Sequence, residues 1–490
     1  MKAAGGLIRS IRAVLVPLLA LFALTGEAPS RPPAPPGENR EAATARRLSA
    51  LRRDPLRLRA FLREMPKGGD LHNHLSGAIY AESYLRWAAE DQLCVATATM
   101  TIVACNGTPG QMSAGDVLQN AALYNQAIDA MSMRNWNPAL NGHDHFFAAF
   151  ARFGPVSSKL AEMLAEVTTR AASEHVSYLE LMLTPDSGPA AIGRSTGWDP
   201  DLAQLRRRLI EAGLKDTVIR RVRERLDTAE SRQRELLRCG TPAADPGCAV
   251  TVRYVAQVGR AAPREVVFAQ MLAWFELAGA EPRVVSLNLV QPEDDPTALR
   301  DFTLQMTMMD VLHRQYPRVP IALHAGELAE GLVPPEALRF HVRQSVQMGH
   351  AVRIGHGTSM MYEDRPMDLL QELAARNVLV EVALSSHEQI LSGKGRPHPL
   401  PLLLAHHVPV ALVTDDMGVS RSTHTGEFVK AVEDHGLDYI TLKRMVRNSI
   451  AHAFADTVTK KKLRLELENA LAAFEQQQAM AAPRPGRTRQ

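Results

Sequence analysis

Short apolar runs rich in β-branched residues recur along this 490-residue chain, and most are followed by a longer amphipathic segment. Short apolar runs that alternate with helical segments are typical of parallel strands joined by right-handed crossovers. Eight such units favour a closed (β/α)8 barrel over an open sheet. We therefore expect an α/β fold, a TIM barrel with a large helical insertion after the first strand and additional helices. The expected strands are 69–72, 176–183, 250–258, 284–290, 319–323, 352–354, 378–383 and 408–413.

The barrel pattern predicts one domain over residues 40–475, which begins with a basic helical lead at 40–64. An insertion over about residues 84–155 separates the first two strands, and a very basic stretch at 205–238 predicts a second long excursion as one helix. Neither segment is bounded by a linker, so we interpret both as insertions. The tail 476–490 is low in complexity, and we expect it to be disordered.

The N-terminal residues resemble a secretory signal. Lys2, Arg9 and Arg12 precede an apolar stretch at 13–24, and small residues follow it. This apolar stretch is shorter than the roughly 20 residues that a membrane helix needs. We expect a signal peptide at 1–28, a Pro-rich linker at 29–39, and an exported protein, periplasmic or secreted, with no stable membrane span once the signal is removed.

If the protein is exported, its four cysteines are candidates for disulfide bonds. Cys94 and Cys105 lie close together in the sequence, as do Cys239 and Cys248. Four cysteines allow three pairings, and proximity favours the two local ones. Neither pair has the Cys-x-x-Cys spacing of a zinc or redox site, and four free thiols are the alternative.

The charge balance argues against nucleic acid as a partner. The sequence has 56 Lys and Arg against 53 Asp and Glu, and aromatic residues make up only 5%. A nucleic-acid binder would show clustered cations or aromatic stacking platforms. The basic stretch at 205–238 mixes acidic residues with its arginines, which favours a solvated face. The sequence leaves the oligomeric state open.

Ionisable residues follow four of the expected strands. The carboxyl ends of barrel strands meet at one mouth, where barrel active sites lie. These side chains should therefore converge there. The first strand ends in His72-Asn73-His74, the fifth in His324-Ala-Gly-Glu327, the sixth in Gly-His356-Gly and the eighth in Thr-Asp415-Asp416.

Four of these residues form a candidate metal site. His72 and His74 are two apart on a strand, so both side chains point to the same face. A third nitrogen from His324 and a carboxylate from Asp415 would complete a set that suits Zn²⁺. The expected fourth strand ends without a Lys that could bridge two metals, so we expect one ion. Catalytic zinc lowers the pKa of its bound water to about 7.

These motifs, in this order, closely resemble the adenosine deaminase family of the amidohydrolase barrels. The resemblance covers about residues 63–448. It implies one zinc ion held by the four residues above and hydrolytic deamination of adenosine or 2′-deoxyadenosine to inosine or 2′-deoxyinosine. Hydroxide formed at the zinc would add to the purine C6 and ammonia would leave.

The resemblance also implies roles for the remaining residues. Glu327 would protonate the purine N1, and His356 would orient the water and assist its deprotonation. Asp415 would act in catalysis as well as in metal binding. Asp416 would hydrogen-bond N7, and His74 would also face the substrate, a small purine nucleoside. A proton-donating Glu327 needs a raised pKa, which a dry pocket would provide.

The sequence departs from the family at substrate contacts. Ser76 stands where an Asp touches the ribose, and Gln291 where a Gly approaches the purine edge. These changes leave open the sugar and the N6 substituent. The alternatives are the same chemistry on another 6-aminopurine derivative or a non-purine amide, and a non-catalytic binding protein on this scaffold.

Overall fold

The computed structural model describes residues 39–137, 142–392 and 397–481. The expected signal peptide, almost all of the Pro-rich linker and the end of the tail lie outside these residues. Within the described part, no helix is both long enough and apolar enough to cross a membrane.

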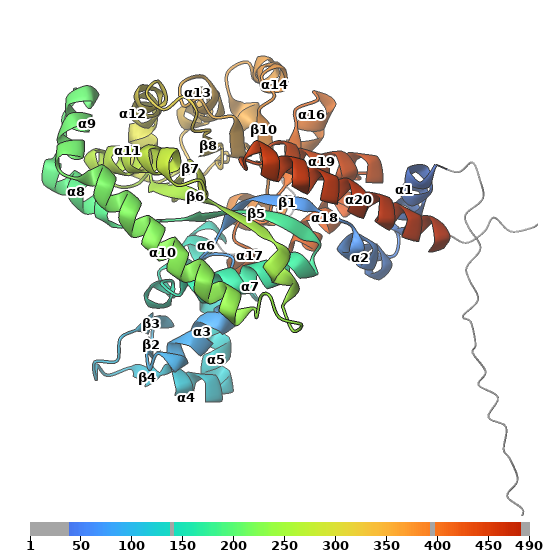
Figure 1. Cartoon of the computed structure of the whole chain (residues 1–490), viewed down its shortest axis with the longest axis horizontal. Coiled ribbons are helices and arrows are strands. Elements are labelled where there is room, and N and C mark those ends of the chain that lie inside the picture. Colours follow the sequence, from blue (N-terminus) through green and yellow to red (C-terminus); the bar gives the residue numbers. More distant parts are fainter. Residues whose placement is uncertain (1–38, 138–141, 393–396, 482–490) are drawn as a thin grey trace, which may run out of the picture. The chain divides into compact units, whose positions relative to one another are not determined.

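Eight parallel strands form the centre of the fold, as expected for a TIM barrel (Figure 1). They make two four-stranded arcs, ordered β1-β5-β6-β7 and β8-β9-β10-β11, and every neighbouring pair is parallel. Isolated parallel bridges join the arcs, one between Asn73 and Asp415 and one between Leu287 and Ile321. The strands are β1 (Gly68–His74), β5 (Val176–Leu183), β6 (Thr251–Gly259), β7 (Val284–Val290), β8 (Ala322–Ala325), β9 (Arg353–His356), β10 (Leu379–Val382) and β11 (Val410–Leu412).

Helices pack around the strands, and their starts follow local sequence signals. Asp295 caps the helix that begins at Pro296, because its carboxylate accepts from the backbone N–H groups of Thr297 and Ala298. Figure 1 shows this outer layer. It comprises α7 (Leu160–Ser173), α11 (Arg264–Ala280), α12 (Pro296–His313), α13 (His341–Gln347), α14 (Pro366–Ala375), α16 (Leu400–Ala405), α18 (His424–Glu433) and α19 (Tyr439–Ala451).

The segment between β1 and β5 contains a small antiparallel sheet, ordered β3-β2-β4. A disulfide between Cys94 and Cys105 ties β2 to the loop between β3 and β4, and a second joins Cys239 to Cys248 ahead of β6. Both local pairings are therefore formed. The elements here are α3 (Ala81–Glu90), β2 (Cys94–Ala96), β3 (Thr101–Val103), β4 (Gln111–Ser113), α4 (Ala114–Gln119), α5 (Ala121–Ala130) and α6 (Gly142–Phe150).

Several helices differ from expectation at identifiable residues. The basic stretch at 205–238 is two helices, α9 (Leu202–Glu211) and α10 (Leu214–Leu236), because Gly213 adopts a left-handed φ of 80° between them. They follow α8 (Gly188–Thr196). The helical lead likewise breaks at Asp54 and Pro55 into α1 (Arg40–Leu51) and α2 (Pro55–Glu64). The last helix, α20 (Thr457–Ala481), continues beyond residue 475, where we expected order to end.

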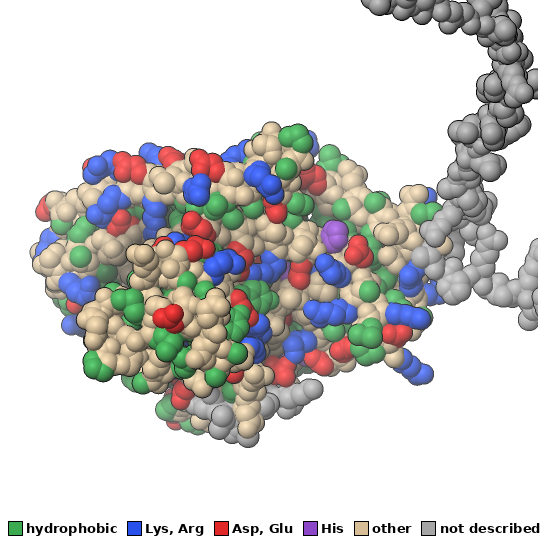
Figure 2. Space-filling view, turned by 90° about the horizontal axis from the view of Figure 1, so that it is seen from below, with side chains coloured by type: hydrophobic (Ala, Val, Ile, Leu, Met, Phe, Trp, Pro, Cys, Tyr) green, Lys and Arg blue, Asp and Glu red, His purple; other side chains and the backbone are tan. Residues whose placement is uncertain are grey.

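Charged side chains of both signs are interspersed on the face seen in Figure 2. Ion pairs also connect α10 to its surroundings. Arg221 pairs with Asp186 at 2.8 Å and Arg223 pairs with Glu281 at 3.2 Å. This pairing agrees with the solvated face expected for the basic stretch.

Candidate metal centre and active site

The ionisable residues of the strand-end motifs lie at one mouth of the barrel. His72 and His74 are on β1, His324 is on β8 and His356 ends β9. The remaining three follow strands directly: Glu327 lies two residues after β8, and Asp415 and Asp416 lie between β11 and the short helix α17 (Met417–Ser420). The structure thus brings together all seven residues that the motifs singled out.

Three imidazole nitrogens and one carboxylate oxygen converge at the centre of this mouth. Nε2 of His324 lies 3.0 Å from Nε2 of His72 and 3.1 Å from Nε2 of His74. Oδ1 of Asp415 lies 3.3 Å from Nε2 of both His72 and His74, and it is buried with no hydrogen-bond partner. One ligand atom from each of the four residues falls within a 4.8 Å cluster. This set of three nitrogens and one oxygen fits a metal ion such as zinc.

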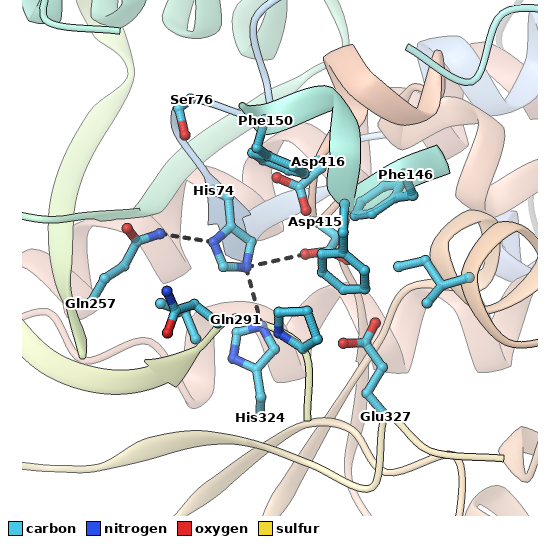
Figure 3. A pocket seen from close by; sticks show the side chains of 14 residues that line it. His74, Ser76, Phe146, Phe150, Gln257, Gln291, His324, Glu327, Asp415 and Asp416 are labelled. Atoms are coloured by element: carbon cyan, nitrogen blue, oxygen red, sulfur yellow. Dashed lines mark hydrogen bonds and ion pairs between the residues drawn. The ribbon is translucent and has the colours of Figure 1, made fainter. Parts of the chain in front are cut away.

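The far side of each imidazole is held by another residue. Nδ1 of His72 donates to Oε2 of Glu381 at 2.7 Å, and Nδ1 of His324 donates to Oδ1 of Asn288 at 2.9 Å. Nδ1 of His74 lies 2.9 Å from the Gln257 side-chain amide (Figure 3). In His72 and His324, a proton on Nδ1 leaves the Nε2 lone pair free, as a metal ligand requires. Sequence reasoning did not identify Glu381 or Gln257, because nothing in the local sequence shows which strands face each other.

Electrostatics at the cluster favour positive charge. Burial lowers the pKa of His72, but the neighbouring carboxylates of Asp415 and Glu381 outweigh it and raise this pKa to about 10. The Asp415 pKa lies well below its usual range: burial opposes this shift, and the nearby imidazoles, that of His72 first, cause it. Two buried carboxylates thus surround His72, and a bound cation would offset their charge.

An ion-pair chain extends from His72 across the barrel interior. Oε1 of Glu381 forms an ion pair with Nε of Arg353 at 2.6 Å, and the same guanidinium lies 2.5 Å from Oε2 of Glu180. The Arg353 guanidinium also lies 3.7 Å from the ring centre of Phe454. All three charged side chains are buried. The arginine therefore compensates the charge of the carboxylate that orients His72.

Backbone strain concentrates around the site. His356, Asp415 and Gln291 have φ values of 66°, 58° and 81°, in the left-handed region that non-glycine residues rarely adopt. Asp416 sits tightly against Gly77, where an added Cβ would lie 1.6 Å from Oδ1 of Asp416. Glycine at this position therefore permits the close approach of the carboxyl group.

Glu327 and its neighbours supply groups for proton transfer. Burial, reinforced by the negative charges of Asp415 and Glu293, raises the pKa of Glu327 well above its usual value. Oε1 of Glu327 lies 3.6 Å from Nδ1 of His356, whose pKa burial lowers to about 4. Burial and the charge of Asp415 likewise raise the pKa of Asp416. The site therefore combines carboxyl groups of raised pKa with an imidazole of lowered pKa.

A cavity of about 410 Å³ opens onto these groups (Figure 3). This volume lies within the usual range of small-molecule sites, roughly 300–1,000 Å³. Helix α6 contributes Phe146, Phe147 and Phe150 to its wall. The remaining lining residues are His74, Ser76, Gln257, Val290, Gln291, Pro292, His324, Glu327, Ile390, Asp415 and Asp416.

The two residues that depart from the family pattern both line this cavity. Tyr84 donates to the backbone carbonyl of Ser76 at 2.7 Å, which fixes the turn after β1. The side-chain oxygen of Gln291 accepts the backbone N–H of Ala261 at 3.0 Å. The Gln291 side chain is therefore tied to the loop after β6.

Comparisons with known proteins agree with this architecture. A sequence profile described as adenosine deaminase matches residues 144–470. An adenosine deaminase from Enterococcus faecalis is 31% identical over 153 residues, which cover 31% of this chain and 42% of that protein. An adenosine deaminase-like protein from Drosophila melanogaster is 26% identical over 210 residues, covering 42% of this chain and 56% of that protein. The alignments thus span about half of these curated relatives.

Solved structures share the fold at low sequence identity. An amidohydrolase from Burkholderia ambifaria with bound Zn has a TM-score of 0.57 at 18% identity, covering 91% of this chain and 98% of that one. The N6-mAMP deaminase of Arabidopsis has a TM-score of 0.52 at 20% identity, covering 84% and 99%. Since the profile matches about two thirds of the sequence and the motif residues meet at one mouth of a TIM barrel, the chain belongs to the adenosine deaminase family.

Proposed function

We propose that this protein is a zinc-dependent aminohydrolase that converts adenosine and 2′-deoxyadenosine to inosine and 2′-deoxyinosine with release of ammonia. One observation carries the proposal. A cluster of three imidazole nitrogens and a carboxylate oxygen lies beside Glu327, a buried acid with a raised pKa, at the wall of a single cavity.

One zinc ion per chain would be held by His72, His74, His324 and Asp415. When bound there, zinc lowers the pKa of a water molecule to about 7 and so supplies a nucleophile at neutral pH. The unpartnered Oδ1 of Asp415 and the outer hydrogen bonds to His72 and His324 support this ligand set.

The protein's own groups would handle the protons. Glu327, protonated because its pKa is raised, donates to the purine N1 and makes C6 electrophilic. Nε2 of His356 is buried without a hydrogen-bond partner and would accept a proton from the attacking water. The purine N7 is an acceptor, so Asp416 must be protonated to donate to it, which agrees with its raised pKa.

The charge of the pocket favours a nucleoside over a nucleotide. Among the described lining residues the acidic groups are Glu327, Asp415 and Asp416, and neither Lys nor Arg is present. A 5′-phosphate needs cations or a cluster of N–H donors, and the ionised carboxylate of Asp415 would repel it. The aromatic rings on α6 would contact the base, the amide of Gln291 would face the purine edge, and the hydroxyl of Ser76 offers a hydrogen bond to the sugar.

A second candidate keeps the chemistry and changes the substrate to another 6-aminopurine derivative. Ser76 and Gln291 motivate it, because both line the cavity where typical family members have other residues. The Arabidopsis structural neighbour, described as an N6-mAMP deaminase, points the same way.

We also propose that the protein is exported. The signal-like residues 1–28 and the two disulfides support a location in an oxidising compartment, periplasmic or extracellular.

A substrate panel tests the function. Adenosine, 2′-deoxyadenosine, AMP and N6-methyladenosine would each be incubated with the protein and followed by ultraviolet absorbance. We expect the largest kcat/KM for the two unmodified nucleosides and little turnover of AMP. Preferential turnover of N6-methyladenosine or AMP would favour the second candidate. The variant His72→Ala should lose both zinc and activity, and stoichiometric zinc in this variant would contradict the ligand set.

A further inference from the structure

A buried carboxylate behind the active site, Glu293, contacts the backbone that carries the proposed acid. Glu293 lies in the loop between β7 and α12, three residues after Val290. One oxygen accepts the N–H of Gly326 at 3.1 Å, and the other accepts the N–H of Glu327 at 2.8 Å. Its side chain is 1% exposed, so water cannot replace these bonds easily.

Two cationic or hydrogen-bonding side chains hold Glu293 in place. Nδ1 of His341 donates to Oε1 at 2.6 Å, and the His341 ring stacks on Phe302 with 3.8 Å between ring centres. The Arg260 guanidinium lies 3.8 Å from the same oxygen and also donates to the backbone carbonyls of Leu289 and His324. The carboxylate therefore sits in a fixed, charge-compensated position between β7, β8 and α13.

The opposite side of the same peptide segment is also held. The carbonyl of Gly326 accepts the backbone N–H of Ser359 at 2.9 Å and the hydroxyl of Thr358 at 2.8 Å. Gly326 has a φ of 76°, which only glycine adopts readily, and this turn directs Glu327 into the cavity. Hydrogen bonds on both faces of this peptide segment therefore fix the position of the turn.

We propose that Glu293 is a positioning residue for the deamination: by binding two consecutive backbone N–H groups it fixes the turn that aims Glu327 at the substrate. The inference rests on the proposed function, since it concerns how the proton-donating side chain of Glu327 is oriented toward the substrate. Displacement of a catalytic group by about 1 Å can cost roughly 100-fold in rate. A misoriented Glu327 side chain should therefore lower kcat and leave zinc binding intact.

The chain offers a matched control in Glu363. This second buried carboxyl group also accepts two consecutive backbone N–H groups, those of Val342 and Arg343 in the first turn of α13, and it does not line the cavity. Replacing either residue with Gln removes a buried carboxyl group that accepts two N–H groups. Both variants should therefore lose stability, and only Glu293→Gln changes the group that binds the N–H of Glu327.

The experiment compares Glu293→Gln and Glu363→Gln in the zinc-loaded full-length protein. We expect Glu293→Gln to lose about 10- to 100-fold in kcat with KM, zinc content and circular dichroism unchanged, and Glu363→Gln to keep kcat. Hydrogen exchange of a peptide covering residues 324–329 should accelerate in Glu293→Gln alone. Should Glu293→Gln fail to fold, Glu293→Asp, which keeps the charge but shortens the reach, should show the same pattern.

Two results would overturn the proposal. Wild-type kcat and unchanged exchange in the folded Glu293 variant would show that the turn keeps its position without this carboxylate. Equal losses of kcat in both variants would show that the effect is general destabilisation. If the wild-type protein fails to deaminate adenosine, the proposed function fails, and the exchange measurement still decides whether Glu293 fixes the turn.

Discussion

Replacement of Glu381 tests how the protein prepares its metal ligands, because this residue contacts His72 and does not line the cavity. The variant Glu381→Gln keeps the size of the side chain. Its amide oxygen can still accept Nδ1–H of His72, but the amide NH₂ then faces Nε of Arg353, which forms an ion pair with the carboxylate at 2.6 Å in the native protein. The variant thus loses this ion pair and leaves the arginine partly uncompensated.

The size of the effect follows from the burial of the pair. Both side chains, His72 and Glu381, are 1% exposed, so solvent does not screen the lost charge. Loss of such an outer partner typically weakens metal affinity by about 10- to 100-fold, which corresponds to about 1.4–2.8 kcal/mol. Competition for zinc against a chromophoric chelator measures this affinity directly, without a substrate.

The control is again Glu363→Gln, because the hydrogen bonds of this buried side chain go to Val342 and Arg343 and not to the metal ligands, and this variant should keep its zinc affinity. Unchanged affinity in Glu381→Gln would refute the view that the carboxylate prepares His72 for the metal. Equal weakening in both variants would trace the effect to lost stability.

Three further outcomes are expected. Glu327→Gln should keep one zinc ion but lose about 10²- to 10⁴-fold in turnover, the usual contribution of a general acid. Steady-state kinetics and metal analysis would measure both, and near-normal turnover would show that Glu327 is not the proton donor. In the native protein, the acid must stay protonated and its pKa is raised, so activity should persist above the ordinary Glu pKa and fall on the alkaline side of the pH–rate profile as Glu327 ionises. Loss of activity already as the pH rises through the ordinary Glu pKa would contradict a raised pKa of Glu327. Replacing Cys239 and Cys248 with Ser should lower the free energy of unfolding by about 2–3 kcal/mol and leave kcat unchanged, since neither residue lines the cavity. Thermal and urea denaturation would measure the loss of stability, and an unchanged unfolding midpoint would contradict it.

The positions of the chemical groups could be predicted because the barrel imposes them. Once 69–72, 319–323, 352–354 and 408–413 are taken as parallel strands, the residues that follow them must meet at one mouth. The strand boundaries shifted by a few residues, as with β8 (Ala322–Ala325), but the order along the chain was enough to place His72, His324, His356 and Asp415 together.

The residues that hold those groups could not be predicted in the same way. Glu381 lies within a strand expected to be apolar, and its partner His72 is 309 residues away. Gln257 and Glu293 depend in the same way on which strands and loops become neighbours. Gln291 stands where the resemblance places a Gly at the purine edge, and neither its bond to the Ala261 N–H nor its left-handed backbone conformation is signalled by the local sequence.

Helix breaks were missed for a different reason. The Asp-Pro pair at 54–55 is a recognisable helix start and Gly213 is a recognisable break, but both lie inside long basic stretches that we interpreted as continuous helical segments. These errors changed the number of helices and left the site unaffected, because neither break lies at the mouth of the barrel.

The most direct test of the account is the ultraviolet spectrum of adenosine incubated with the mature protein, with and without a zinc chelator. We predict a shift to the inosine spectrum that the chelator abolishes and added zinc restores. An unchanged adenosine spectrum, from protein that carries one equivalent of zinc, would contradict the proposed reaction and turn attention to the substrate contacts of Ser76 and Gln291.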